Sequence, residues 1–522
     1  MAEFVTANFV PLLFLALLCF LLTGIPVAFG LAATGLLFGY VGMSLDLFSP
    51  NLFQALPQRV FGIMQNDTLL AIPFFTFMGI LLEKSGMAED LLETVGQVFG
   101  PVRGGIAIAV ILVGALLAAT TGVVAAAVIS MGLISLPIML RYGYNRTVAT
   151  GTITASGTLA QAIPPSLVLI VLADQLGRSV GDMYSGALIP GLLLVGLYLL
   201  FIVLVALVRP SWVPALPPEA RIYREDNGSS GHASLLALLV LCAAAGWGWS
   251  EVHDGIMKSW TGRTNAAPGD EVLIMSMTVS SLLALALALV NKVTGLGLLS
   301  RLAQQVTFVL IPPLVLIFLV LGTIFLGVAT PTEGGAMGAL GALVMAGLRK
   351  RLDFPLLRQA MDSTARLSTF VLFILIGSTV FSFTFNAADG HIWVEHLFDD
   401  MPGGALGFLI VVNILVFILG CFIEPIAIMV MTLPIMFPVM KESGFDPIWL
   451  GVVSVKLAEI GVLTPPVGLN VFVVRSSSPI PVTLGQVFAG VTPFIVLDFL
   501  SLGLYVIFPE MITWLPNLMS PN

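Results

Sequence analysis

The sequence predicts an all-α polytopic membrane protein made of two inverted-topology repeats, each with a re-entrant helical hairpin and a helix broken by prolines. The first observation is composition: of 522 residues, 58% are hydrophobic and 10% are charged, and bilayer-length apolar stretches recur along the chain. The second is a duplicated motif, Ile163-Pro164-Pro165-Ser166 and Thr464-Pro465-Pro466-Val467, in which equivalent prolines lie 301 residues apart. Paired broken helices in two apolar halves are typical of secondary transporters.

Composition also narrows the function. The net charge of −8 is thinly spread and indicates no nucleic-acid partner. Cys19, Cys242 and Cys421 lie far apart in apolar segments, so we expect buried small side chains rather than disulfides. No His, Cys or carboxylate cluster has metal spacing, and no nucleophile motif occurs, so the sequence predicts no transition metal, no cofactor and no enzyme. No Lys or Arg precedes the first apolar segment, so we expect no cleaved signal peptide.

The expected elements follow the apolar stretches in order. Two segment pairs joined by a few small or turn residues are predicted to be hairpins: 104–120 with 123–140, and 404–421 with 424–440. An amphipathic helix on the membrane surface is expected at 85–100, and solvated connections are expected at 209–233 and 251–270. The predicted crossings are 8–23, 25–41, 58–83, 147–173, 186–208, 234–250, 271–291, 306–327, 331–348, 366–386, 448–473 and 486–509.

Basic residues orient these crossings. The run Arg349-Lys350-Arg351 marks a cytoplasmic loop, and counting outward from it places most other Lys and Arg on the same side. Both termini are then periplasmic, and the two hairpins enter the membrane from opposite faces. Charge alone does not show that the hairpins stop halfway.

The paired prolines suggest ion sites. Proline has no N–H, so Pro164 and Pro165 free the carbonyls of Ala160 and Gln161, and the second pair frees those of Gly461 and Val462. Free carbonyls inside a bilayer need a partner, and sodium, a hard cation, suits oxygen ligands. A kinked helix with satisfied neighbours is the alternative. The repetition in inverted halves favours ion sites.

The hairpin tips, at 119–122 and 420–425, contain small and hydroxyl residues. These would let the backbone approach a ligand, and the outgoing helix N-termini would suit a carboxylate. Tight helix packing by small residues explains the same pattern equally well.

Four ionisable residues lie in or next to the predicted membrane segments. Lys456 and Glu459 are one turn apart, and a structural ion pair is the preferred interpretation over a functional one. Glu333 is expected to form a capping box with Thr330. Asp498 has no partner that the sequence identifies.

At this point the chain resembles the large membrane subunit of tripartite ATP-independent periplasmic (TRAP) transporters. The resemblance rests on four stretches: Leu70-Ala71-Ile72-Pro73-Phe74-Phe75, residues 118–166, Ala329-Thr330-Pro331-Thr332-Glu333, and the segment from Leu463 to Asn470. It implies an elevator-type carrier of the ion transporter superfamily kind, in a bacterial inner membrane. It also implies sodium coupling, a small membrane (Q) subunit, and a periplasmic substrate-binding (P) protein that delivers an organic acid.

The chain departs from the family pattern in places. Valines and alanines follow Gly122 where a serine-rich tip is common, Glu424 stands where an aspartate is common, and the insert 209–270 is additional. The chain has no room for the small subunit before Phe9, so we expect that subunit on a separate chain.

The predicted division places scaffold at 1–100, at 186–400 with its polar insert 209–270, and at 481–522. It places the transport domain at 101–185 and 401–480. The predicted sodium ligands are Thr121, Gly122, Gly157, Ala160, Gln161, Gly420, Glu424, Gly461, Val462 and Thr464. The predicted substrate contacts are Thr120, Thr121, Pro165, Ser166, Pro425, Pro466 and Asn470.

The predicted function is therefore sodium-driven uptake of a small organic acid. Two alternatives remain open: a sodium–carboxylate symporter that works without a binding protein, and a non-transport intramembrane protein. The missing catalytic constellation and the duplicated proline breaks both weigh against the second.

Overall fold

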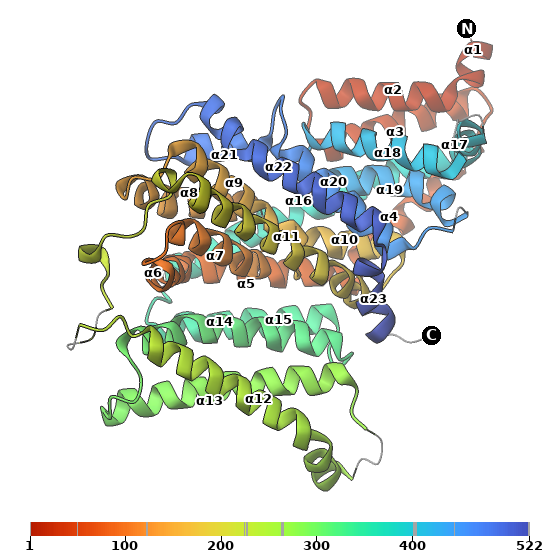
Figure 1. The fold of residues 1–522 in the computed structure, drawn as a ribbon. Helices are drawn as coiled ribbons and strands as arrows, with labels where there is room; N and C mark the ends of the chain where they lie inside the picture. Colours follow the sequence, from red (N-terminus) through yellow and green to blue (C-terminus); the bar gives the residue numbers. More distant parts are fainter. Residues whose placement is uncertain are drawn as a thin grey trace.

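In the computed structural model of the chain, every regular element of the described residues is a helix, as predicted (Figure 1). The structure describes residues 2–49, 51–121, 124–223, 225, 228–262, 266–399, 404–442 and 444–519. Within these ranges eight helices are long and apolar enough to cross a membrane, or nine if one bent pair counts as a span. The helices run roughly parallel, and both chain ends lie at the same end of the bundle.

The first segment of the chain contains a bend that the sequence analysis missed. The predicted crossing 58–83 is two helical stretches, Leu52–Met64 and Asp67–Lys84, that meet at 44°. Asn66 makes the break, because its side chain accepts a hydrogen bond from the Thr68 N–H at 3.0 Å and donates one to Asp174. The helices of this segment are α1 (Ala2–Ala7), α2 (Phe9–Leu22), α3 (Val27–Ser44), η1 (Leu52–Ala55), α4 (Leu56–Met64), η2 (Asp67–Leu70) and α5 (Ala71–Lys84).

The amphipathic helix expected at 85–100 is α6 (Met87–Phe99), with acidic residues in its first turn. Its apolar face does not rest on lipid. Met87, Leu91 and Val95 are buried, and α6 packs against α7 (Gly105–Thr121) and α14 (Arg301–Phe325). Neighbouring helices therefore cover the face that was expected to meet the membrane surface.

The two repeats have matching local structure. In each half a hairpin precedes a broken helix, and the helix starts with an equivalent cap: Asn145 accepts from the N–H groups of Thr147 and Val148, and Asp446 accepts from those of Ile448 and Trp449. The helices of the first repeat are α7, α8 (Val124–Arg141), α9 (Arg146–Ala162) and α10 (Leu167–Leu176), and those of the second are α18 (Gly404–Gly420), α19 (Pro425–Glu442), α20 (Pro447–Leu463) and α21 (Leu469–Ser477).

Packing shows that each hairpin reaches only half of the bundle's depth. The first hairpin lies along α9, the first arm of its own broken helix, and along α21, the second arm of the other one. The second hairpin lies in the same way along α20 and α10. Figure 1 shows α8, α9 and α21 toward one end of the bundle, and α10, α19 and α20 toward the other. The hairpins are therefore re-entrant and inserted from opposite ends, and the repeats interlock.

One long helix follows each repeat. These are α11 (Val180–Val208) and α22 (Leu484–Ile507), which is followed by α23 (Glu510–Met519). The packing of α22 on α9 requires glycine on both helices, because a Cβ atom on Gly151 would lie 2.1 Å from the carbonyl oxygen of Gly490. This close approach holds α22, near the C-terminus, against α9 of the first repeat.

The segment 209–233 is not the freely solvated connection that was predicted. Val213 and Leu216 are buried, and the segment crosses the ends of the first hairpin. Its carbonyls at Trp212 and Val213 accept hydrogen bonds from the N–H groups of Asn145 and Gly104, both at 2.9 Å. The short helices η3 (Pro210–Trp212) and η4 (Pro218–Ala220) form part of this strap. Apolar side chains inside a polar stretch account for the error.

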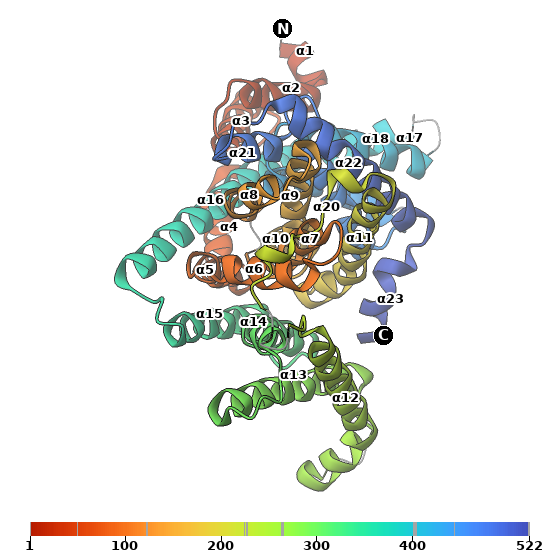
Figure 2. The same ribbon diagram turned by 60° about the vertical axis from the view of Figure 1, so that its left-hand side comes forward.

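The middle of the chain forms a lobe beside the body (Figures 1 and 2). The helices of the lobe are α12 (His232–Thr261), α13 (Gly269–Thr294), α14 and α15 (Pro331–Leu348). The chain then returns to the body through α16 (Phe354–Ala387) and α17 (Gly390–Asp399). The connection expected at 251–270 is largely helical, because α12 continues past His253, whose Nε2 lies 3.1 Å from Glu271 on α13. The predicted capping box is present, with the Thr330 N–H 2.8 Å from Glu333 Oε2.

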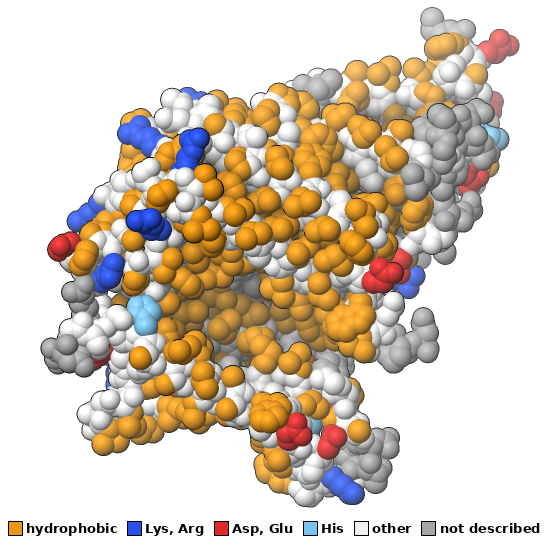
Figure 3. Space-filling model, in the orientation of Figure 1, with side chains coloured by type: hydrophobic (Ala, Val, Ile, Leu, Met, Phe, Trp, Pro, Cys, Tyr) orange, Lys and Arg blue, Asp and Glu red, His pale blue; other side chains and the backbone are white. Residues whose placement is uncertain are grey.

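The surface has the pattern of a membrane protein. Hydrophobic side chains cover the middle of the face shown in Figure 3 and line the hollow between lobe and body. Lys and Arg gather toward the end where α8 and the 209–233 strap lie. This asymmetry agrees with a multi-pass protein that has one basic face.

Candidate functional site

The first helix break leaves backbone oxygens without helical donors. Residues 163–166 separate α9 from α10, and the Pro164–Pro165 bond is cis. The Ile163 N–H donates to the Leu159 carbonyl at 2.9 Å. The positions three and four residues after Gln161 are both prolines, so no N–H of the next turn can reach its carbonyl. The Ala160 carbonyl also lacks a helical donor. Pro164, four residues later, has no N–H, and the Ile163 N–H already donates to the Leu159 carbonyl.

The second break differs at one carbonyl. The Pro465–Pro466 bond is also cis, but the Thr464 N–H donates to the Gly461 carbonyl at 3.0 Å. The predicted free carbonyl at Gly461 is therefore wrong, because the helix ends in a tighter i+3 turn. The Val462 carbonyl still lacks a helical donor, because the residues three and four positions later, Pro465 and Pro466, have no N–H. The Thr464 hydroxyl donates to the Ile460 carbonyl at 2.6 Å.

The two breaks also differ in exposure. Pro164, Pro165 and Ser166 are buried, whereas Pro465 and Pro466 are exposed. The backbone at the second break is therefore more accessible in this chain than the backbone at the first break.

The tip of the second hairpin rests directly on the helix that precedes the second break. A Cβ atom on Gly461 would lie 2.6 Å from the backbone carbon of Gly420, and one on Gly420 would lie 3.1 Å from the Ala458 oxygen. Two predicted site residues on different elements are therefore in backbone contact. Glu424 caps α19, which begins at Pro425, by accepting hydrogen bonds from the N–H groups of Ile426 and Ala427.

The first tip is only partly described. Gly122 and the side chains of Thr120 and Thr121 lie outside the described residues. Gly157, a predicted sodium ligand on α9, faces Val128 of α8, and a Cβ atom there would lie 2.1 Å from the valine Cγ2. Gly157 thus supports close packing of the two helices, which was the alternative explanation for small residues in this region.

Several polar side-chain atoms near the breaks are buried without a hydrogen-bond partner among the described residues. They belong to both repeats, and each needs a partner such as water, an ion or a ligand. The atoms are Gln161 Oε1, Ser166 Oγ, Glu424 Oε2 and Asn470 Nδ2. All four residues had been predicted as sodium or substrate contacts.

A buried ion cluster lies beside the first break. The predicted Lys456–Glu459 pair is present, with Nζ and Oε2 3.1 Å apart. Asp498 of α22 is part of the same cluster, with its Oδ1 2.8 Å from the Lys456 Nζ and 2.7 Å from the Tyr198 hydroxyl, which donates. Sequence reasoning missed this contact because Asp498 belongs to another helix 42 residues away.

The cluster has two carboxyl groups for one cation. One cation faces two carboxylates, and Glu459 Oε1 and Asp498 Oδ2 have no hydrogen-bond partner among the described residues. A cavity of about 20 Å³ adjoins it, lined by Gln161, Lys456 and Glu459 among others. A space of this size holds one water molecule or one small ion. A second carboxyl group in an apolar interior is neutralised either by a proton or by a bound cation.

Comparison with known proteins identifies the family. A family model described as "Tripartite ATP-independent periplasmic transporter, DctM component" matches residues 14–511. The chain belongs to this family. It is 29% identical to the C4-dicarboxylate TRAP transporter large permease protein DctM of Pseudomonas aeruginosa, over 91% of this chain and 92% of the relative. It is 25% identical to the sialic acid TRAP transporter large permease protein SiaM of Vibrio cholerae, over 95% and 96% of the two chains.

A solved structure resembles this TRAP permease in fold. The Alcanivorax borkumensis YdaH transporter matches with a TM-score of 0.50 and 15% identity, over 88% of this chain and 89% of that one. Membership makes the chain a multi-pass inner-membrane transport subunit rather than an enzyme. The described residues contain no group of three or more His, Cys, Asp or Glu side chains that could hold a metal.

Proposed function

We propose that this TRAP permease uses a sodium gradient to take up a small organic acid that a periplasmic binding protein delivers. The observation that carries the proposal is the set of unpaired buried oxygens around two interlocked helix breaks, next to a cluster in which one lysine faces two carboxyl groups. Relatives whose names specify C4-dicarboxylates and sialic acid both act on acids, which supports an acidic substrate.

The sodium ions would bind beside the breaks. At the first break, the carbonyls of Ala160 and Gln161 and the Gln161 side chain are the available oxygens. At the second, we propose the Val462 carbonyl, with Gly420 and Glu424 of the facing hairpin tip. Oxygen donors of this kind suit a hard cation, and the partial negative charge at the C-terminal ends of α9 and α20 adds to the attraction.

The substrate would bind between the two tips, where helices start again. Ser166 precedes α10, Pro425 begins α19, and Asn470 lies in the first turn of α21. Helix N-termini carry partial positive charge and free N–H groups, both of which favour a carboxylate. Transport would follow from an elevator movement of the interlocked repeats against the remaining helices.

The small membrane subunit is expected on a separate chain, since the family is tripartite and DctM is one component. A decisive experiment reconstitutes the permease with its small subunit and binding protein in liposomes and measures substrate uptake. An inward sodium gradient should drive accumulation, and an equal potassium gradient should not. Equal uptake in both gradients would remove sodium from the mechanism, and uptake by the permease alone would favour the self-sufficient symporter.

A matched variant tests the ion cluster itself. Asp498→Asn keeps the side-chain shape and the hydroxyl contact of Tyr198 but removes one of the two ionisable carboxyl groups. Its uptake should need higher sodium concentrations than that of the wild type. An unchanged sodium dependence would show that the cluster is structural only. Sodium coupling itself would then be decided by the gradient experiment above.

A further inference from the structure

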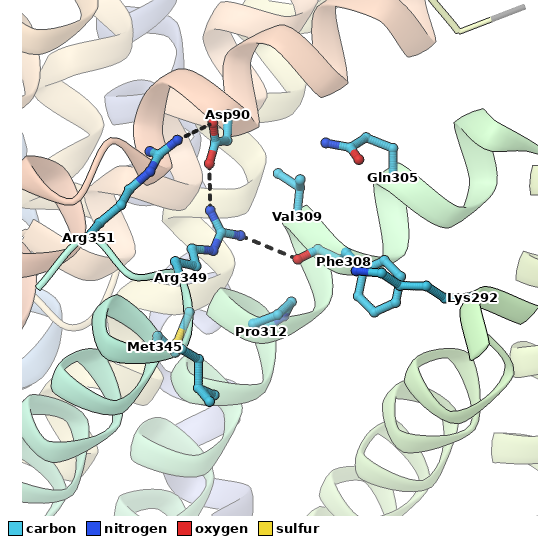
Figure 4. A pocket seen from close by; sticks show the side chains of 10 residues that line it. Asp90, Lys292, Gln305, Phe308, Val309, Pro312, Met345, Arg349 and Arg351 are labelled. Carbon is cyan, nitrogen blue, oxygen red and sulfur yellow. Dashed lines mark hydrogen bonds and ion pairs between the residues drawn. The ribbon is translucent and has the colours of Figure 1, made fainter. Parts of the chain in front are cut away.

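A second pocket lies far from the helix breaks, at the junction of the lobe and α6 (Figure 4). Its volume is about 440 Å³, and α6, α13, α14 and the end of α15 all contribute to its lining. Two kinds of side chain meet here. Charged and polar groups form one side, and apolar residues of α14 and α15 form the other.

The polar side is positively charged. Three cations, Lys292, Arg349 and Arg351, line the pocket with one carboxylate, Asp90. Asp90 accepts from both arginines, with contacts of 2.7 Å to Arg349 and 3.3 Å to Arg351. One carboxylate cannot balance three cations, so the pocket attracts an anion. The other acidic residues of α6, Glu89 and Glu93, are exposed and do not line it.

The two arginines are fixed in place. Arg349 also donates to the Phe308 carbonyl at 3.3 Å, and Arg351 donates to the Ser85 carbonyl at 2.8 Å. Burial lowers the pKa of Arg349, an effect that Asp90 partly offsets, and the guanidinium stays charged at neutral pH. Rigid guanidinium groups are well suited to binding phosphate oxygens.

Lys292 has a different role. Its Nζ lies 5.0 Å from the centre of the Phe308 ring, and it forms no ion pair with a carboxylate of the described residues. Figure 4 shows it reaching from α13 across this ring toward the side of the pocket where Arg349 lies. Lys292 is thus a cation available for a ligand.

The surroundings indicate how that ligand is presented. Met345, Leu348 and Pro312 line the apolar side of the pocket. Exposed apolar side chains continue from it along the lobe, including Leu289 and Val293 of α13, and Leu348 of α15 is 79% exposed. A charged site at helix ends beside a lipid-facing apolar surface matches an amphiphile with an anionic head and hydrocarbon tails.

We propose that this pocket binds the phosphate headgroup of an anionic membrane phospholipid. The phosphate lies among Lys292, Arg349 and Arg351, and the acyl chains follow the exposed faces of α13 and α15. The basic run at 349–351 places this pocket at the expected cytoplasmic surface, where anionic lipids are plentiful. Because α6 packs on α7, the lipid links the lobe to the base of the first hairpin.

The test uses the full-length chain in detergent and counts bound lipids by native mass spectrometry. Phosphatidylglycerol is titrated against phosphatidylcholine with the same acyl chains. The wild type should retain phosphatidylglycerol preferentially, and Lys292→Gln should weaken its binding about five-fold, since a basic residue near a membrane surface contributes about 1 kcal/mol.

Lys350→Gln is the matched control, because Lys350 is exposed, carries the same charge and does not line the pocket. Its lipid binding should equal that of the wild type. Equal losses in both variants, or no preference for phosphatidylglycerol, would overturn the proposal. Inorganic phosphate is the second probe: binding of phosphate that depends on Lys292 without any retained lipid would show a free anion site and refute the lipid assignment.

Discussion

The buried cluster around Lys456 gives the sharpest test of the energetics. Lys456 is the only cation facing Glu459 and Asp498 among the described residues that form this cluster, and the three side chains are at most 3% exposed. Lys456→Met keeps the approximate length of the side chain and removes the charge. Two carboxylates then remain in an apolar interior without a counter-ion, and breaking a buried pair in this way costs about 3–5 kcal/mol.

The assay is unfolding of the purified permease in mixed micelles by an increasing fraction of denaturing detergent, followed by circular dichroism. Lys456→Met should lower the free energy of unfolding by about 3–5 kcal/mol. Asp498→Asn should cost less, about 1.5–3 kcal/mol, because it leaves one cation with one carboxylate. Lys258→Met is the control at an exposed position and should change stability by less than about 0.5 kcal/mol.

The order of these effects is the decisive result. A Lys456→Met protein as stable as the Lys258→Met protein would show that water or protons balance the carboxylates. An Asp498→Asn protein less stable than Lys456→Met would show that the direct contact between Lys456 and Asp498, rather than the charge balance of the whole cluster, dominates its stability.

Three further predictions concern other parts of the permease. Gly461→Ala should lower the free energy of unfolding by about 1–3 kcal/mol and slow transport, since its Cβ would meet the Gly420 backbone at 2.6 Å. Gly485→Ala, with open space around it, should leave stability unchanged, and equal stability of the two variants would contradict the close contact. Thr330→Ala should lower the free energy of unfolding by about 1 kcal/mol through loss of the capping box, and an unchanged value would mean that the cap contributes nothing. Pro165→Ala and Pro466→Ala should each restore a helical donor and weaken sodium dependence; unaltered sodium affinity in both would refute the carbonyl sites.

The sequence was sufficient for the architecture because its signals are local. Nine of the twelve predicted crossings match described helices that are long and apolar enough to span a membrane, counting the bent pair as one; 8–23, 331–348 and 448–473 do not. The paired prolines end α9 and α20 within one residue of the predicted breaks. The capping box at Thr330 and the i, i+3 pair at Lys456 were also predictable, because both depend on neighbours in one helix.

The errors arose wherever a distant element intervened. The amphipathic face of α6 was assigned to lipid, but α7 and α14 cover it. The 209–233 strap was assigned to solvent, but its backbone pairs with Gly104 and Asn145 at the ends of the first hairpin. Periodicity shows that a face is apolar but does not show what covers it.

The sequence by itself determined that this protein has two inverted halves with broken helices, because proline lacks an N–H in any surroundings. Only the tertiary structure decided how the halves interlock, with each hairpin lying against an arm of the other repeat's broken helix. Only it brought Asp498 to Lys456, and Lys292 to the arginines that follow α15, since a charge finds its partner through packing between helices and not through spacing along the chain.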